Sequence, residues 1–331
     1  MAVRPDAVER PPAAPEDLEQ YRRQLTGYCY RMLGSLFEAE DAVQETLVRA
    51  WKGMDAFEGR SAVRSWLYRI ATNVCLDMLR GRRRRALSMD LGAPGTADSF
   101  TGATRPGDAW VEPVPDGRVL PDDGDPAELA AARETIRLAF VTALQHLPAR
   151  QRAVLILREV LRWQATEVAE LLDTSVASVN SALQRARATL AARHVDADTA
   201  PASVTDAAQA ELLARYVDAF ERYDIPTLVA LLHEDAVMSM PPYDFWLRGP
   251  VEMGRWFLGE GSGCSGSRLV ATAANGCAAF GSYRSDGEGG HRPWAIQIIE
   301  VSGGRITGHH NFLDTSLFAA FGLPEHLSAA D

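Results

Sequence analysis

The chain has 331 residues, of which 47% are hydrophobic and 24% charged, and its formal net charge is −10. This length predicts two or three domains, and the composition is typical of a globular protein. No run of 18 or more apolar residues occurs, and residues 1–15 lack the apolar stretch of a secretory signal. We therefore expect a cytoplasmic protein without a membrane span, and a loose N-terminal tail over residues 1–15.

The four cysteines indicate no metal site. None belongs to a C-x-x-C pair, and none has a histidine nearby at the spacing of zinc ligands. We expect buried, reduced thiols, with no metal and no cofactor. A disulfide between Cys264 and Cys277 is the alternative.

The charge is unevenly distributed along the chain. Residues 1–85 and 127–195 each carry a net charge of +3, whereas residues 86–126 carry −6 and residues 196–331 carry −10. The total alone would argue against a nucleic-acid partner. Two basic segments that are separated and followed by acidic ones are compatible with such a partner.

Residues 16–85 predict a compact helical module. Apolar residues recur at helical spacing in its first part, and Ser35 with Glu38 has the spacing of a capping box ahead of a second helix. A third, long helix is expected from about Ser61 to Arg84, because a further apolar stripe continues through that stretch.

Residues 86–126 predict an acidic linker. They have no hydrophobic periodicity and are rich in Pro, Gly and Asp, so we expect an extended or disordered segment. A second helical module, residues 127–195, follows, with Asp125 as N-cap and Pro126 at the first helical position. Its helices are expected at roughly 127–146, 149–161, 164–172 and 175–193.

A short link, residues 196–206, leads to a last domain of different character, residues 207–331. Two helices are expected ahead of several β-type segments, and Ser302-Gly303-Gly304 has the composition of a hairpin turn. Helices followed by a curved antiparallel sheet make an α+β domain, so the fold class is two all-α domains plus an α+β domain. The expected strands are Ala236–Met240, Arg268–Ala274, Ala278–Tyr283, Trp294–Val301 and Arg305–Leu313.

A helix-turn-helix is predicted over residues 164–190. Asp173-Thr174-Ser175 forms the turn, and a 3-4-3-4 apolar stripe follows, so the second helix must expose a polar face. Short polar groups precede arginines on that face, which suits base contacts in the major groove followed by phosphate contacts. An ordinary helical hairpin with a solvated face is the alternative. The apolar stripe is Val176, Val179, Leu183, Ala186 and Leu190. The residues expected to contact DNA are Ser178, Asn180, Ser181, Gln184, Arg185 and Arg187.

Two polar faces are predicted in the first module. Asp41, Gln44 and Glu45 lie at positions i, i+3 and i+4 and share one helix face, with a solvated acidic face as the alternative. On the long helix a polar and cationic stripe runs beside Trp66 and Tyr68, which suits single-stranded DNA, although Trp66 also fits the core. The stripe consists of Arg69, Asn73, Asp77, Arg80 and Arg84. The run Arg82–Arg85 is expected to contact phosphates.

Three segments resemble extracytoplasmic-function (ECF) sigma factors of the sigma-70 type. Residues 28–52 (YCYRMLGSLFEAEDAVQETLVRAWK) resemble regions 2.1–2.2, residues 61–85 (SAVRSWLYRIATNVCLDMLRGRRRR) resemble regions 2.3–2.4, and residues 145–190 resemble region 4. The resemblance implies that the Asp41 face docks on core RNA polymerase. It also implies that the long helix reads and melts the −10 promoter element, with a flipped base held by the loop at about 55–61, and that region 4 reads the −35 element.

The chain departs from that family at two places in the helix-turn-helix. Asp173 stands where many members have Gly, and an aspartate can still adopt the left-handed conformation at modest cost. Asn180-Ser181-Ala182 stands where Lys-Ser-Arg is frequent. The second departure leaves the −35 sequence open.

Residues 207–331 resemble SnoaL-like domains, α+β cones with a central pocket, and the whole arrangement resembles actinobacterial sigma factors of the sigma-G and sigma-J types. Enzymes with this cone use a pocket Asp and His as an acid–base pair, which makes His309, His310 and Asp314 catalytic candidates, with a structural or surface role as the alternative. Strand alternation puts only one of the two histidines inside. The expected pocket walls are Tyr243, Trp246, Trp256, Tyr283 and Trp294.

We therefore expect a transcription initiation factor that binds core RNA polymerase and promoter DNA and is not an enzyme. Its acidic C-terminal domain is expected to regulate it in cis, with a small-molecule ligand as a candidate further partner. The first alternative is a bifunctional fusion whose C-terminal domain is an isomerase- or cyclase-like enzyme. A stand-alone repressor is the second.

Overall fold

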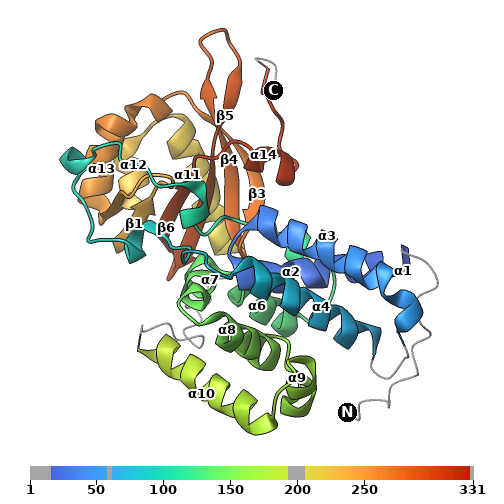
Figure 1. Ribbon diagram of the computed structural model, residues 1–331. Coiled ribbons are helices and arrows are strands. Elements are labelled where there is room, and N and C mark those ends of the chain that lie inside the picture. Colours follow the sequence, from blue (N-terminus) through green and yellow to red (C-terminus); the bar gives the residue numbers. More distant parts are fainter. Residues whose placement is uncertain (1–15, 58–61, 193–205, 329–331) are drawn as a thin grey trace. The chain divides into compact units, whose positions relative to one another are not determined.

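The fold is that of a computed structural model, which describes residues 16–57, 62–192 and 206–328 (Figure 1). The expected tail, residues 1–15, and residues 196–205 of the expected link lie outside the described residues. The chain forms two compact units. The first comprises Met1–Arg84 with Gly117–Asp196, and the second comprises Arg85–Asp116 with Ala197–Asp331. In the part that the structure describes, no helix has the length and apolar character needed to cross a bilayer.

The first helical module begins the first unit. The Ser35 hydroxyl caps its third helix by accepting a hydrogen bond from the Glu38 N–H at 3.2 Å, as the sequence predicts. The expected helix from Ser61 to Arg84 is shorter than predicted, because Gly81 takes a left-handed conformation with φ of 77° just after the helix ends. The elements are α1 (Glu16–Glu19), α2 (Arg22–Leu33), α3 (Leu36–Lys52), η1 (Met54–Ala56) and α4 (Val63–Met78).

The second helical module completes this unit. Asp125 Oδ1 accepts hydrogen bonds from the N–H groups of Ala127 (2.8 Å) and Glu128 (3.3 Å), which confirms the predicted helix start. The single helix expected over 127–146 is wrong: the Thr135 hydroxyl donates to the carbonyl of Ala132 at 2.7 Å, and the helix ends there. The elements are α5 (Asp116–Val119), α6 (Pro126–Glu134), α7 (Leu138–Gln145), α8 (Ala149–Leu155), the π-turn η5 (Ile156–Val160), α9 (Ala165–Leu171) and α10 (Val176–Ala191).

Two buried arginines join the helical modules. Arg31 on α2 donates to the hydroxyl and the carbonyl of Thr135, at 2.7 and 3.1 Å. Arg152 on α8 donates to the Met32 carbonyl and, at 2.6 Å, to Gln145 Oε1. Burial lowers the pKa of both guanidinium groups to about 10, because desolvation disfavours the cation. The two modules therefore share a desolvated polar interface.

The second unit is built on a six-stranded sheet in the order β2-β1-β6-β5-β4-β3. Neighbouring strands are antiparallel except β1 and β6, which are parallel. The core between one face of the sheet and its helices contains Phe220, Phe257 and Phe280. The strands are β1 (Leu232–Ser239), β2 (Trp246–Arg248), β3 (Arg268–Ala274), β4 (Cys277–Ser285), β5 (His291–Ser302) and β6 (Arg305–Phe312). The helical elements are α11 (Asp206–Glu221), α12 (Ile225–Ala230), α13 (Pro250–Leu258), η6 (Glu260–Cys264) and α14 (Leu317–Ala320).

All five predicted strands are present, with ends that differ by a few residues. The predicted hairpin turn is confirmed, since Gly303 and Gly304 both have positive φ, 56° and 74°, and connect β5 to β6. Strand β2 and helix α13 were not predicted. All four cysteines are free; three are buried and Cys264 is partly buried, so the alternative disulfide is absent.

The segment expected to be an extended or disordered linker is ordered between Arg85 and Asp116, so the expectation of disorder was wrong for those residues. We call residues 85–116 the strap. Three of its residues form β-bridges: Gly95 with Leu247 on β2, Pro115 with Ala274 on β3, and Thr104 with Tyr243 in the loop before β2. The strap has no periodicity because it buries separate side chains in short turns instead of one helix or strand face. Its buried apolar residues are Ala86, Leu87, Ala97, Trp110, Val111 and Val114. Its turns are η2 (Ser88–Asp90), η3 (Ala97–Ser99) and η4 (Gly107–Ala109).

Candidate nucleic-acid interface

Helix α10 presents the polar face that the sequence predicts. Ser175 caps the helix by accepting from the Ser178 N–H at 3.1 Å, and Asp173 in the preceding turn has φ of 49°, the left-handed conformation expected of it. The residues buried on its inner face are Val179, Leu183, Ala186 and Leu190. The six predicted DNA-contacting residues are all exposed: Ser178, Asn180, Ser181, Gln184, Arg185 and Arg187.

Two details of α10 differ from expectation. Val176, assigned to the buried stripe, is 38% exposed because it lies in the first turn, at the edge of the contact with α9. Arg187 forms an ion pair with Glu159 at 2.6 Å, which holds it along the side of the module. The remaining polar face of α10 keeps the order of short polar groups first and Arg185 later, which suits base contacts followed by phosphate contacts.

The polar stripe predicted on the long helix is divided by the end of α4. Arg69, Asn73 and Asp77 are exposed on the helix itself. Arg80 lies beyond the helix end and pairs with Asp77 at 2.9 Å, and Arg84 contacts His146 Nδ1 at 2.6 Å. Only the first three residues therefore share one helix face. The loop expected to hold a flipped base lies largely outside the described residues, at 58–61.

The aromatic residues beside this stripe are mostly committed to packing. Tyr68 is 1% exposed, and its ring lies 5.2 Å from that of Tyr28 and 5.1 Å from that of Trp163. Trp66 is partly buried and stacks on Phe57 at 4.8 Å. The expectation that Tyr68 faces single-stranded DNA is therefore wrong for this conformation, because its ring fills the junction between α4 and the second module.

The arginine run after α4 is not uniformly available to phosphates. Arg85 is 6% exposed and donates to the Trp110 carbonyl at 2.7 Å within the strap, so the expectation that it contacts DNA is wrong. Arg82 pairs with Glu38. Arg83 and Arg84 are exposed, and they keep the cationic character that nonspecific phosphate contact requires.

The acidic face predicted on α3 is present. Asp41, Gln44 and Glu45 are all exposed on the side opposite the buried Val43 and Leu47. In this structure Gln44 Oε1 accepts from Arg22 at 3.3 Å and Glu45 pairs with Arg49 at 2.6 Å. Exposed pairs of this kind are weak and easily exchanged, so the face can pair with a basic partner surface.

Comparison with known proteins identifies these modules. Family models match residues 18–85 (Sigma-70 region 2), residues 137–190 (Sigma-70, region 4) and residues 213–309 (SnoaL-like domain). The ECF RNA polymerase sigma factor SigG of Mycobacterium tuberculosis is 46% identical over 312 residues, which are 93% of this chain and 83% of SigG. The chain belongs to the ECF sigma factor family.

Other relatives agree with this assignment. SigJ of Mycobacterium tuberculosis is 28% identical to this sigma factor over 93% of the chain and 94% of SigJ. The crystal structure of SigJ matches with a TM-score of 0.59 at 24% identity, covering 94% of this chain and all of that one, which shows a shared fold. SigW of Bacillus subtilis is 31% identical over 51% of this chain and 82% of SigW. The predicted fold class is confirmed.

The two candidate histidines, His309 and His310, lie on opposite faces of β6, yet both are buried, at 3% and 2% exposure. His309 Nε2 lies 2.9 Å from the Tyr216 hydroxyl, which donates to Gln297 Oε1 at 2.8 Å, so His309 acts as the donor to Tyr216. Burial, with a smaller contribution from His310, lowers the pKa of His309 to about 3 and keeps it neutral. His310 Nδ1 lies 2.8 Å from the Ser239 hydroxyl.

The predicted catalytic residues do not form a group. Asp314 is exposed after β6 and accepts hydrogen bonds from the N–H (3.0 Å) and hydroxyl (2.6 Å) of Ser316, so it shapes a turn. Two of the five expected pocket walls lie elsewhere: Tyr283 packs on Phe318, and Trp294 carries the Arg284 guanidinium 3.4 Å from its ring centre. The sequence shows which residue types are present here, but it does not show which neighbours their side chains pack against.

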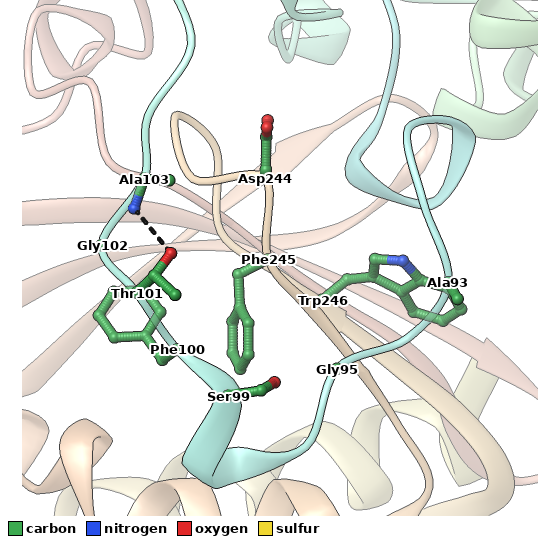
Figure 2. Close-up of a pocket in the computed structure, with 10 residues that line it drawn as sticks. All are labelled: Ala93, Gly95, Ser99, Phe100, Thr101, Gly102, Ala103, Asp244, Phe245 and Trp246. Atoms are coloured by element: carbon green, nitrogen blue, oxygen red, sulfur yellow. Dashed lines mark hydrogen bonds between the residues drawn. The ribbon is translucent and has the colours of Figure 1, made fainter.

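A cavity of this sigma factor's second unit lies beside the strap (Figure 2). Its volume is about 170 Å³, and strap residues 93–103 form one side while Asp244, Phe245 and Trp246 form the other. Trp246 was expected to line a pocket and does so, but the other residues were missed. Phe100, an isolated aromatic in a Gly- and Thr-rich stretch, is the one signal in the sequence that could have indicated a buried contact there.

Proposed function

We propose that this sigma factor binds core RNA polymerase through the Asp41 face of α3 and directs transcription initiation, with region 2 at the −10 element and region 4 at the −35 element. The observation that carries the proposal is α10, whose six exposed polar residues stand opposite four buried apolar residues in a protein 46% identical to SigG. An initiation factor works where polymerase and chromosome are, which supports a cytoplasmic location.

Region 2 and region 4 are packed together in the first unit, and the packing involves the proposed −10 face. The Arg69 guanidinium donates to the Glu170 carbonyl at 3.4 Å, which brings α9 of region 4 against α4 of region 2. Promoter elements that are read separately require the two regions to separate. We infer that this packed form is inactive and that polymerase binding opens it.

Regulation in cis by the SnoaL-like domain is the second part of the proposal. The strap that connects region 2 to region 4 is bound to this domain by a reciprocal pair of hydrogen bonds: Val114 N–H donates to Asn275 Oδ1 at 3.0 Å, and Asn275 N–H donates to the Val114 carbonyl at 3.1 Å. Ion pairs of Asp98 with Arg255 and of Arg105 with Asp244 flank the bridges. A bound strap limits the chain length available for the two regions to move apart.

The enzyme alternative receives no support from the geometry of the candidate residues. His309 is neutral and committed to Tyr216, and Asp314 points into its own turn. An acid–base pair requires both groups within reach of one substrate, which these positions do not provide.

Polymerase retention and run-off transcription test the proposal directly. The variant Asp41→Lys/Glu45→Lys should lose retention on purified core enzyme, whereas Glu211→Lys, an exposed acid on α11, should not. Retention of both variants equal to that of the natural chain would remove the polymerase-binding claim.

A second pair of variants tests the cis regulation. Asp98→Lys/Asp244→Lys places like charges in both strap ion pairs and should change run-off output, while Asp108→Lys, exposed in the same strap, should not. A chain truncated after residue 205 should also differ from the full-length protein. Equal output from all of these chains would show that the SnoaL-like domain does not regulate initiation.

A further inference from the structure

The cavity at the strap has two walls that come from distant parts of the sequence. The strap contributes Ala93, Gly95 and the stretch 99–103, and the loop entering β2 contributes residues 244–246 (Figure 2). About 150 residues separate the walls along the chain. The cavity therefore exists only while the strap is bound to the SnoaL-like domain.

Aromatic rings define the shape of this cavity. The rings of Phe100 and Phe245 lie 5.2 Å apart in an edge-on arrangement, and both line it. Phe100 is fixed from behind by Tyr243 and Trp256, each 5.0 Å away and also edge-on. Trp246 closes the far side, where its indole N–H donates to the Gly92 carbonyl at 2.9 Å. Flat walls at these angles accept a flat ring through further edge or face contacts.

Polar groups contribute about half of the exposed lining, beside the aromatic rings. The Thr101 hydroxyl lies at the cavity and is engaged by the Ala103 N–H at 3.4 Å, a long hydrogen bond (Figure 2). The Asp244 carboxylate lies at the edge, where it pairs with Arg105. One hydroxyl or amine on a bound ring would find an acceptor at this edge.

The size of the cavity suits a single ring. Its volume of about 170 Å³ is close to the roughly 150 Å³ of an apolar protein cavity that binds benzene, and is below the roughly 300–1,000 Å³ of sites for larger ligands. The cavity is open to solvent on one side, so a polycyclic molecule would extend out of it.

We propose that this cavity binds a small monocyclic aromatic molecule with one hydrogen-bonding group, and that the bound molecule holds the strap on the SnoaL-like domain. A molecule that contacts both walls binds the docked strap and not the released one, so it shifts the equilibrium toward docking by mass action. The consequence for transcription rests on the proposed regulation in cis: a held strap keeps regions 2 and 4 from separating and lowers initiation.

Hydrogen exchange of the full-length protein in phenol tests the binding step without polymerase. The reporters are strap amides that bond to the SnoaL-like domain: Gly95 to the Trp246 carbonyl (2.8 Å), Ala97 to Glu252 Oε2 (2.7 Å) and Arg105 to the Pro242 carbonyl (2.9 Å). Exchange at these amides should slow about tenfold when phenol is present at ten times its Kd. Cyclohexanol, which is not flat, should have a smaller effect at the same concentration.

Filling the cavity supplies the control variants. Ala103→Leu places a larger side chain in the cavity and should abolish the phenol effect, whereas Ala210→Leu, exposed on α11, should keep it. Ala93→Leu fills the cavity from another position and replaces Ala103→Leu if that chain fails to fold. Phenol-independent exchange in the natural protein overturns the proposal, and so does faster exchange, which would mean that phenol displaces the strap.

Run-off transcription separates this proposal from the one on which it rests. Phenol should lower the run-off output of the natural chain and should leave the output of Ala103→Leu unchanged. A chain that protects its strap in phenol but supports no transcription under any condition would support the cavity and contradict the sigma-factor proposal. A chain that initiates transcription normally but shows no protection of the strap amides in phenol would support the sigma-factor proposal and contradict the cavity proposal.

Discussion

The indole ring of Trp163, in region 4, lies 5.1 Å from the phenol ring of Tyr68, in region 2, with 57° between the ring planes. Both side chains are buried, at 6% and 1% exposure. The Arg64 guanidinium lies 5.6 Å from each ring centre and covers the pair. The two regions thus share an aromatic contact on the helix that is proposed to bind the −10 element, and separating them exposes both rings.

Replacing Trp163 with Ala should loosen this contact. Loss of a buried tryptophan lowers the free energy of unfolding by about 3 kcal/mol, which urea titration would measure. The substitution also destabilises the packed form of regions 2 and 4 relative to the separated form. We therefore expect tighter binding of a fluorescent single-stranded −10 oligonucleotide. Trp51→Ala is the stability control, since Trp51 is 55% exposed and should change unfolding by less than about 0.5 kcal/mol. Unchanged oligonucleotide binding in Trp163→Ala would contradict the inferred closed state.

Replacing Arg152 with Met should destabilise the same interface by a different route. The Arg152 guanidinium donates hydrogen bonds to the buried carbonyls of Met32 and Leu147. Methionine fills a similar volume but donates no hydrogen bond. Leaving buried acceptors unpaired costs about 1–3 kcal/mol, so we expect a loss of about 3 kcal/mol in unfolding free energy. Arg150→Met, at an exposed position two residues earlier on α8, should stay within about 0.5 kcal/mol. Equal midpoints for the two variants would show that the buried guanidinium is dispensable.

The helix-turn-helix could be predicted in detail because its evidence is local. The buried positions Val179, Leu183, Ala186 and Leu190 follow one helical stripe, and the opposite side must then be exposed. The same local reasoning failed at Tyr68, whose position beside a polar stripe says nothing of Trp163, a partner 95 residues away in the chain. Periodicity shows which face is buried but does not identify what covers it.

The strap shows the limit of composition as a guide. Its high content of Pro, Gly and Asp predicted disorder, because a segment with few apolar residues cannot offset the entropy of ordering on its own. In the structure, burial of strap side chains against the later domain offsets that entropy. Trp110 is 3% exposed, and Ala97 joins the core around Phe220. The prediction of catalytic residues failed for a related reason. Strand alternation correctly placed His309 and His310 on opposite faces of β6, but it could not show that both faces are covered.

The buried His309 should make the SnoaL-like domain sensitive to acid. Its pKa is lowered to about 3 in the folded protein against about 6.5 in the unfolded chain. Below pH 6.5 the unfolded chain takes up a proton that the folded chain does not, so stability is complete above that pH and falls as the pH drops, by about 1.4 kcal/mol per unit toward the folded pKa. Chemical unfolding from about pH 7 to about pH 5 should show this slope.

The variant His309→Gln isolates the contribution of that histidine. It removes the titrating group while keeping a side chain that can donate to Tyr216, so its stability should vary less with pH than that of the natural protein. His233→Gln, on β1, is the matched control and should retain the natural slope. If His309→Gln and the natural protein lose stability in parallel as the pH falls, another group is responsible for the acid sensitivity.

Helix α10 should divide its work between bases and phosphates along its length. Arg185→Ala removes a cation from the later part of the helix, so we expect duplex binding to weaken about equally for all sequences, with the slope of log affinity against log salt reduced by about one. Asn180→Ala lies in the earlier part and should instead lower the preference for one −35 sequence by about 1–3 kcal/mol, with the salt slope unchanged. The measurement is competition binding of the polymerase holoenzyme to a −35 library at several salt concentrations. Both residues are exposed on the same helix, so a difference between the two variants would not result from misfolding. If Arg185→Ala changed the sequence preference and Asn180→Ala changed the salt slope, the helix would enter the groove in the opposite direction.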